Sequence, residues 1–387
     1  MRSFHSHLIV AVVILVGCGP NYATLHPERV RRIDIAAEGS DATFCGNADR
    51  VGLAAVVTYR DGTALATASG AKRRLDFAEV AVLASLGSVT RDGVLQLPED
   101  RLVWHDRKVR VVARVVKRSD VMASHELVPR YDCGGAEFRG AAGDGGRSGK
   151  DGRAGARGPA LRVSLAYIDT LLNGRLVLAR VAVEGGAEPA DYYLIDGRGP
   201  AEPFTIDASG GRGGDGGAGW VGADGTDGSD GSSGSDGSGC GDGSDGTDGS
   251  SGSSGGDGGP GGDGGPGGDG GSIVIEYDER HPELVRHIRF LVDGGVGGDG
   301  GPGGSGGDGG DGGDGGSGGS PGLPSFDEQC HPSGGRSGSD GADGSDGNAG
   351  PSGTAGSAGR PGSIRTRARS VATLFAPEIA SGTAIVR

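Results

Sequence analysis

The chain has 387 residues and a net charge of -14; 86 of its residues are glycine, and only 4% are aromatic. This composition leaves too few large side chains for an ordinary core along the whole chain. The acidic balance also argues against nucleic acid as a partner, because phosphates repel an acidic surface.

Residues 1–17 have the features of a signal peptide. Arg2 supplies a positive charge, and Leu8–Val16 is an apolar run too short to span a bilayer. The run ends in Leu-Val-Gly-Cys, which resembles the lipobox of bacterial lipoproteins. The resemblance implies cleavage between Gly17 and Cys18 and the attachment of fatty acids such as palmitate to Cys18. An ordinary secretory peptide with an incidental cysteine is the alternative.

Acylation of Cys18 implies a stable membrane anchor, because several acyl chains on one residue bind a bilayer far better than one. Gly19 follows the cysteine, where an aspartate would indicate retention in an inner membrane. The resemblance therefore implies the bacterial outer membrane or cell surface. Residues 18–28 would be the tether, and the membrane is the first expected partner.

Export indicates an oxidising compartment, where cysteines form disulfides. Apart from Cys18, the chain has Cys45, Cys133, Cys240 and Cys330, which allow three pairings. We favour Cys45–Cys133, which bracket one candidate domain, and Cys240–Cys330, which lie in or beside glycine tracts. Zinc is the rival hypothesis, but no two of these cysteines have the spacing of zinc ligands.

Residues 29–139 are predicted to form a β-sandwich. Short apolar runs, among them Val51–Tyr59, Val80–Leu86, Val94–Leu97 and Lys108–Lys117, are separated by turn signals such as Arg-Asp-Gly, as expected for the strands of a sandwich. The stretch VVTYRDGTALAT resembles bacterial immunoglobulin-like domains. That resemblance implies an immunoglobulin-like sandwich near the membrane.

Residues 140–160 place glycine at every third position and mix Lys and Arg with Asp, which resembles bacterial collagen-like sequences. A solvated linker is an equally open interpretation. Residues 161–209 are predicted to be a unit of strands, rich in Val, Ile, Leu and Tyr. Within it, Asn173-Gly174 separates two apolar runs and predicts a hairpin.

Residues 210–271 form the longest tract, with glycine at every third position; Cys240 is the one departure. A period of three matches the three residues per turn of polyproline II. Cys240 is a candidate for the point where the tract folds back. The position before each glycine carries an acidic stripe that is expected to face water: Asp215, Asp224, Asp227, Asp230, Asp236, Asp242, Asp245, Asp248, Asp257, Asp263 and Asp269.

Residues 272–293 are predicted to be a β-hairpin. Ser272–Asp278 and Leu284–Asp293 are both apolar, and Pro282 lies in the connection. Such a hairpin would place the flanking glycine tracts side by side and antiparallel. After the second tract, residues 294–322, come a cysteine-containing loop at 323–334, a third tract at 335–362 and predicted C-terminal strands at 363–387.

Residues 255–271 and 294–319 have two glycines per turn, and they resemble the Gly-Gly-X repeats of polyglycine-II bundles, known from an insect antifreeze protein and phage tail adhesins. The resemblance implies helices joined by backbone hydrogen bonds. A collagen triple helix is less favoured, because the central tract has few prolines and would bring many like charges together. Disorder is the alternative for the serine-rich residues 226–254. Because a collagen triple helix is less favoured, a monomer is favoured over a trimer.

No catalytic residue is predicted. Gly303–Gly307 matches a nucleophile-elbow pattern but lacks the strand and helix that this motif needs. Trp220, the one large side chain at the position after glycine in the 210–271 tract, is interpreted as a packing residue, with ligand binding as the alternative. Weak calcium binding is the one cofactor hypothesis, and it requires carboxylates from neighbouring helices. Its candidate ligands are Asp257, Asp263, Asp269, Asp308, Asp311 and Asp314.

The sequence thus predicts a mainly β protein with long glycine-rich segments and little α-helix beyond the signal peptide. Its expected function is non-enzymatic: a lipid-anchored spacer or matrix component of the bacterial envelope. The alternative is an adhesin that presents a flat acidic face, with or without calcium, to a surface polymer, a mineral or another cell.

Overall fold

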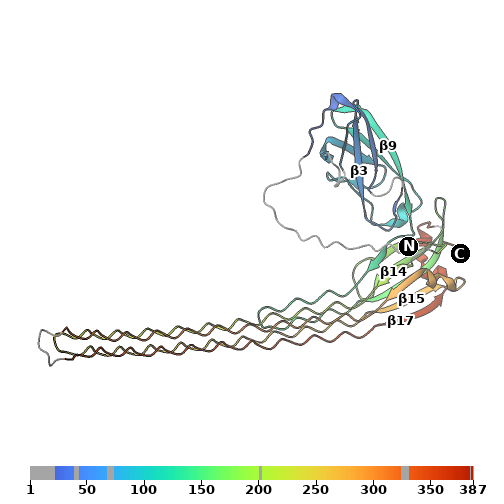
Figure 1. Cartoon of the computed structure of the whole chain (residues 1–387). Coiled ribbons are helices and arrows are strands. Elements are labelled where there is room, and N and C mark those ends of the chain that lie inside the picture. Colours follow the sequence, from blue (N-terminus) through green and yellow to red (C-terminus); the bar gives the residue numbers. More distant parts are fainter. Residues whose placement is uncertain are drawn as a thin grey trace, which may run out of the picture.

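The computed structural model describes residues 22–38, 43–67, 74–199, 203–323, 331–383 and 385–386. Strands account for 32% and helices for 7%, which confirms the mainly β class. The chain forms an N-terminal domain, a second β unit and a long rod that projects from that unit (Figure 1). The leader, Cys18 and Cys330 lie outside the described residues.

The N-terminal domain consists of two sheets packed around one core. One sheet has the order β1-β3-β7-β6, with β4 added beside β3, and the other has the order β2-β9-β8-β5. The strands are β1 (Val30–Ala37), β2 (Thr43–Cys45), β3 (Arg50–Tyr59), β4 (Ala64–Ala66), β5 (Val80–Ala84), β6 (Ser88–Val89), β7 (Val94–Gln96), β8 (Val109–Val115) and β9 (Arg118–Arg130). Short 3₁₀ helices connect them: η1 (Pro27–Arg29), η2 (Phe77–Glu79) and η3 (Arg101–Val103).

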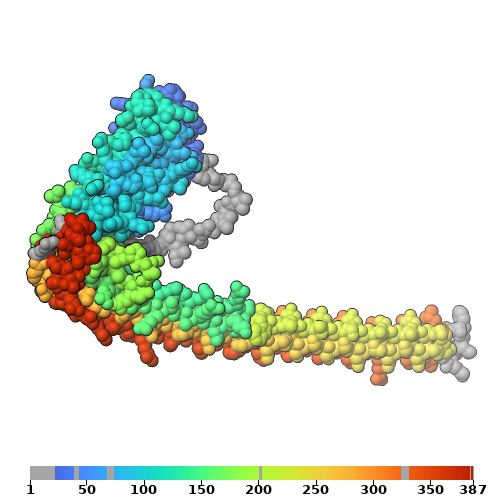
Figure 2. All heavy atoms as spheres, turned by 180° about the vertical axis from the view of Figure 1, so that it is seen from behind, coloured from blue at the N-terminus to red at the C-terminus, as the bar shows by residue number. Residues whose placement is uncertain are grey.

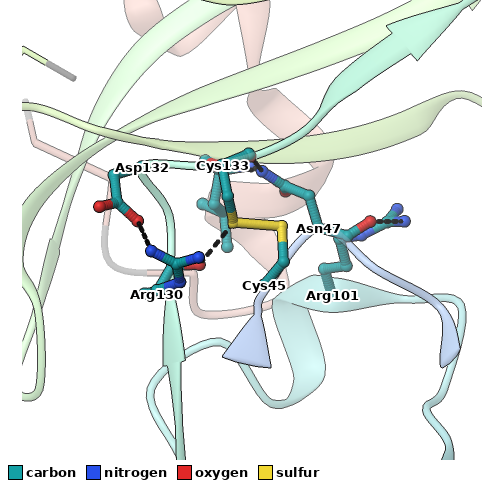
Figure 3. Close-up of a disulfide and its surroundings, with 7 residues drawn as sticks. Cys45, Asn47, Arg101, Arg130, Asp132 and Cys133 are labelled. Atoms are coloured by element: carbon teal, nitrogen blue, oxygen red, sulfur yellow. Dashed lines mark hydrogen bonds and ion pairs between the residues drawn. A yellow bond between two sulfur atoms is a disulfide. The ribbon is translucent and has the colours of Figure 1, made fainter. Parts of the chain in front are cut away.

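Alternation of side chains explains this core. Along β3, Leu53, Ala55 and Val57 are buried while the residues between them are partly exposed, as expected for a strand with one face inward. Val111 and Ala113 of β8 contribute from the opposite sheet. The disulfide Cys45–Cys133 is present, as predicted, and it joins β2 to the residues that follow β9 (Figure 3).

The second β unit also has two sheets. A five-stranded sheet has the order β13-β12-β11-β15-β17, and a three-stranded sheet has the order β10-β14-β16. The strands are β10 (Gly135–Glu137), β11 (Ala160–Thr170), β12 (Gly174–Val183), β13 (Asp191–Asp196), β14 (Phe204–Asp207), β15 (Ser272–Asp278), β16 (Ile288–Leu291) and β17 (Ser363–Arg369). β11 and β12 pair antiparallel, so the hairpin predicted at Asn173-Gly174 is confirmed. Gly174 has the left-handed φ of 70° that this turn requires.

The predicted hairpin at residues 272–293 is wrong. β15 lies parallel between β11 and β17 in the larger sheet, whereas β16 lies parallel to β14 in the smaller one. The 3₁₀ helix η4 (Pro282–His287) carries the chain from one sheet to the other. Ile273 and Ile288 belong to one core, so the two strands face each other across the sandwich instead of pairing edge to edge.

The C-terminal residues form helices that the sequence did not predict. β17 agrees with the expected strand, but it is followed by α1 (Val371–Leu374) and α2 (Ala376–Ala380). Val371, Leu374 and Phe375 pack against the face of the five-stranded sheet that the three-stranded sheet leaves open. Ile385 then bridges to Ile168. This second cover explains why β11 is buried on both faces.

The rod is built from six segments that continue directly from six strands of the β unit. We name them R1 (140–149), R2 (150–159), R3 (210–238), R4 (241–271), R5 (294–322) and R6 (335–362). R1, R3 and R5 leave the three-stranded sheet after β10, β14 and β16. R2, R4 and R6 return into β11, β15 and β17. The two layers of the sandwich thus become the two layers of the rod (Figure 1).

The N-terminal domain is docked onto the β13 edge of the larger sheet. The buried side chain of Asn47 donates to Leu194 O at 2.7 Å and accepts from Leu194 N at 3.0 Å. Arg101 donates to Tyr192 O at 3.0 Å, and the Asp106 carboxylate accepts from the amides of Leu171 and Leu172. Asn47 and Arg101 lie beside the disulfide in Figure 3.

Candidate interaction surface on the glycine-rich rod

Backbone hydrogen bonds join the rod segments at intervals of three residues. Within one layer, Gly213 N donates to Val296 O at 2.9 Å and Gly216 N to Asp299 O at 2.8 Å, which links R3 to R5 in parallel. Between layers, Gly298 N donates to Gly265 O at 2.9 Å, which links R5 to R4 in antiparallel fashion. The two tracts flanking residues 272–293 are therefore antiparallel neighbours, as expected.

Glycine is required at these positions by contact between backbones. A Cβ added to Gly213 or Gly301 would come well within 3.0 Å of a carbonyl oxygen of the facing segment. Only a residue without a side chain permits that approach. The period of three in the sequence therefore records which side of each turn meets another segment.

The central tract folds back at Cys240. Gly239 has a left-handed φ of 61°, and Gly241 N donates to Ser238 O at 3.0 Å across the turn. Cys240 is disulfide-bonded, and Cys330, the partner predicted for it, lies outside the described residues. With R3 and R4 side by side, the tract extends about 90 Å instead of the roughly 190 Å of a straight chain.

The acidic stripe has an internal role that the sequence did not reveal. Asp224 Oδ1 accepts from Asp308 N at 3.1 Å, and Asp245 Oδ1 accepts from Arg336 N at 2.6 Å. Every aspartate of the stripe accepts a backbone N–H in this way, from R5 or R6 in every case except Asp242, which accepts from Ser333 just before R6. These N–H groups belong to non-glycine positions that the backbone ladder leaves without a partner. The carboxylates are exposed, yet they complete the hydrogen bonding of the rod.

The same device recurs at the R6 edge. Asp340, Asp343 and Asp346 accept from the amides of Gly315, Gly312 and Gly309 at 2.8–2.9 Å. In contrast, the side chains of Asp308, Asp311 and Asp314 on R5 make no hydrogen bond or ion pair with the described residues. Aspartates with one sequence pattern therefore divide into two structural classes.

The six candidate calcium ligands do not come together. Asp257, Asp263 and Asp269 lie on R4 and bond to R6, whereas Asp308, Asp311 and Asp314 lie on R5 in the other layer. Among the described residues, no group of three or more acidic, histidine or cysteine side chains could hold a metal. The backbone N–H of Thr354 holds the pKa of Asp263 below its usual value of 3.8. A single row of carboxylates cannot surround calcium.

Serine and threonine replace glycine where the short R1–R2 hairpin ends. Near the β unit, Gly214 N and Gly217 N of R3 donate to carbonyls of R2. Farther out, the amides of Thr226, Ser229, Ser232 and Ser235 donate to the hydroxyls of Ser253, Ser250, Thr247 and Ser244 at 2.7–2.8 Å. These hydroxyls accept the N–H groups of R3 in the part of the rod that R2 does not reach. R2 covers only the base of the rod (green in Figure 2).

Trp220 lies at this step. A Cβ at Gly259 or at Gly149 would meet its indole ring, so the ring lies over R4 beside the end of the hairpin. This contact agrees with the packing interpretation, although 57% of the side chain remains exposed, as does 66% of the neighbouring Val221.

Two histidines that are separate in the sequence, His281 and His287, contact one tyrosine in the β unit. Tyr167 makes edge contacts with the rings of His281 and His287, with centroids 5.0 and 6.2 Å apart. Burial lowers the pKa of His287, which favours the neutral form of its ring. Gly303–Gly307, in contrast, lies inside R5, where no strand or helix presents the serine as a nucleophile. No single motif could have predicted the contact of these two histidines with Tyr167, because Tyr167 is distant from both of them in sequence.

Comparison with known proteins gives no further lead. No protein-family model, no curated protein and no solved structure matches this chain. Within the described residues, none of the helices has the length and apolar character needed to cross a membrane.

Proposed function

We propose that this chain is a lipid-anchored, non-enzymatic spacer or display protein of the bacterial envelope. In this proposal the N-terminal domain is an immunoglobulin-like sandwich held near the membrane through Cys18, and the rod is a polyglycine-II bundle. The observation that supports it best is the unbroken hydrogen-bond ladder along R3–R6, which gives stiffness that a single polyproline-II helix lacks. An envelope spacer needs stiffness and solubility, and the exposed aspartates supply the latter.

Pairing within one chain favours a monomer over a collagen-like trimer. The ladder amides of R3, R4 and R6 find their acceptors inside the same chain. Sedimentation velocity with mass determination, on the chain without its leader and with Cys18 replaced by serine, tests this proposal. We expect an elongated monomer. A trimer mass would refute the single-chain bundle, and exchange of the rod amides at unfolded-chain rates would refute the ladder.

The anchor has its own test. Labelled fatty acid should be incorporated into the full-length protein expressed in a bacterium that acylates lipoproteins, and the Cys18→Ala variant should remain unlabelled. Equal labelling of the two proteins would remove the lipid anchor from the proposal while leaving the rod unaffected.

The adhesin alternative is favoured by one observation. Trp220 and Val221 are adjacent large apolar side chains that are both exposed on the rod. Cell-attachment assays should then show weaker binding for Trp220→Ala than for the unchanged protein, with the Ser305→Ala rod as the control. Equal attachment of the unchanged protein and both variants would count against the adhesin and favour the spacer function.

A further inference from the structure

β17 is an unpaired edge of the five-stranded sheet. It pairs in parallel with β15 on one side, and among the described residues no strand pairs with its other side. All seven of its residues, Ser363 to Arg369, are exposed, and Ile364 exposes 43% of its surface. A regular strand with this exposure presents free backbone donors and acceptors along its outer side.

The charge on this edge is positive and incompletely neutralised. Arg365, Arg367 and Arg369 alternate along β17, so they share one face of the sheet. Arg369 contacts Glu276 at 3.7 Å, whereas Arg365 and Arg367 have no ion-pair partner within the described chain. No acidic residue lies in the strand. In a protein with a net charge of -14, this edge is a local exception.

This pattern disfavours pairing with a second copy of the same strand. Two β17 strands placed edge to edge would bring arginines of one chain against arginines of the other, which is destabilising. Arginine and lysine are a common means of keeping an exposed edge from pairing with itself. The same guanidinium groups attract a strand of opposite charge.

A groove begins where β17 ends. Its volume is about 570 Å³, and Ser370, which directly follows β17, lies at its rim. The apolar lining comes from Val371, Ala372, Ala376, Ile379 and Ala380, with Glu279 and Arg280 at the side. The groove therefore adjoins the C-terminal end of β17 and offers a place for an apolar side chain there.

We propose that β17 is a docking edge for an extended acidic peptide segment of a partner protein, which adds a strand to the sheet and places an apolar side chain in the groove. Backbone hydrogen bonds would join the added strand to β17, and Arg365 and Arg367 would select acidic side chains at alternate positions of that strand. This interaction goes beyond the spacer function and does not depend on the lipid anchor.

The probe is a fluorescent peptide with Asp and Glu at alternate positions, Val and Thr between them, and a terminal Leu. Fluorescence anisotropy with the leaderless Cys18→Ser chain should show saturable binding. Replacing Arg365 and Arg367 together by serine should weaken it roughly tenfold or more. The control variant, Arg31→Ser with Arg91→Ser, removes the same charge from exposed sites of the N-terminal domain and should bind normally.

Two further peptides separate strand addition from simple charge attraction. A peptide with proline at every second position keeps the acidic charge but loses the N–H of every second residue, so it should bind much more weakly than the first peptide. A peptide with Ser in place of Leu should bind more weakly because the groove stays empty. Equal binding of the proline peptide, or no binding of the first peptide at millimolar concentration, would overturn the proposal.

Discussion

At the scale of single residues, the aspartates of the rod carry the most information. One sequence pattern covers two structural classes: those whose Oδ1 accepts a backbone N–H and those on R5 that accept none. Asp224, Asp227 and Asp230 accept from the amides of Asp308, Asp311 and Asp314, which lie at the same level of the rod. This pairing supplies a matched comparison within one molecule.

We predict that replacing Asp224, Asp227 and Asp230 together by alanine speeds hydrogen exchange at the amides of residues 308, 311 and 314. Loss of one acceptor per amide should raise the exchange rate roughly two- to tenfold. The reciprocal triple replacement of Asp308, Asp311 and Asp314 by alanine removes the same charge but no acceptor. Amide exchange measured by NMR should therefore distinguish the two variants, and identical exchange would contradict the capping role.

Two other carboxylates of the acidic stripe, Asp215 and Asp263, are expected to make the rod sensitive to acid. The pKa of Asp215 is held below its usual value of 3.8 chiefly by the backbone N–H of Asp299, and that of Asp263 by the N–H of Thr354. A pKa lowered in the folded state gives stability above the unfolded pKa, which is lost as pH falls through the folded value. After correction for intrinsic exchange, amide protection in the rod should be constant from about pH 5 to 8 and should decline below about pH 4. Unchanged protection at about pH 2 would contradict this expectation.

At the scale of elements, the rod segments depend on glycine at each contact. Gly301→Ala should disrupt the ladder locally, because its Cβ would meet Gly217 O on the parallel neighbour. Overpacking of this kind costs about 1–3 kcal/mol. Ser305→Ala, on the exposed slot of the same segment, should be nearly neutral. Denaturant unfolding monitored by amide exchange in R5 would measure both, and equal stability of the two variants would show that the backbones are not in contact.

The C-terminal helices should stabilise the larger sheet although they are short. Phe375 is fully buried against the sheet, so Phe375→Ala should destabilise the β unit by about 3–5 kcal/mol. Leu171→Ala is the comparison, because that side chain is 95% exposed in a turn of the same unit. Chemical denaturation would rank the two, and a small effect at Phe375 would mean that the helices are not docked.

At the scale of the whole molecule, the docking of the N-terminal domain sets the direction of the rod. Asn47 is buried at that interface and imitates a strand neighbour by bonding both backbone groups of Leu194. Asn47→Ala leaves these groups without partners and should loosen the interface while each domain stays folded. Small-angle scattering should show a broader distribution of distances, and calorimetry should resolve two unfolding transitions. An unchanged scattering curve would assign the docking to Arg101 and Asp106 instead.

The sequence by itself determined the local structure of this protein. The apolar run Val51–Tyr59 predicted β3, Asn173-Gly174 predicted the β11–β12 hairpin, and the cysteines that bracket the first domain predicted their disulfide. The glycine period also marked the contact side of each rod turn. These signals succeed because side-chain periodicity and glycine conformation act over a few residues.

Only the tertiary structure decided which segments meet. β15 and β16 satisfy every local rule for a hairpin, yet they join different sheets because each finds a parallel neighbour from a distant part of the chain. Residues 371–380 become helical because their apolar groups fit the open face of the five-stranded sheet. Asp224 and Asp308 have the same local pattern, and only the lateral order of R3 and R5 makes one the acceptor of the other. Pairing over long separations depends on packing of the whole chain, which no short pattern records.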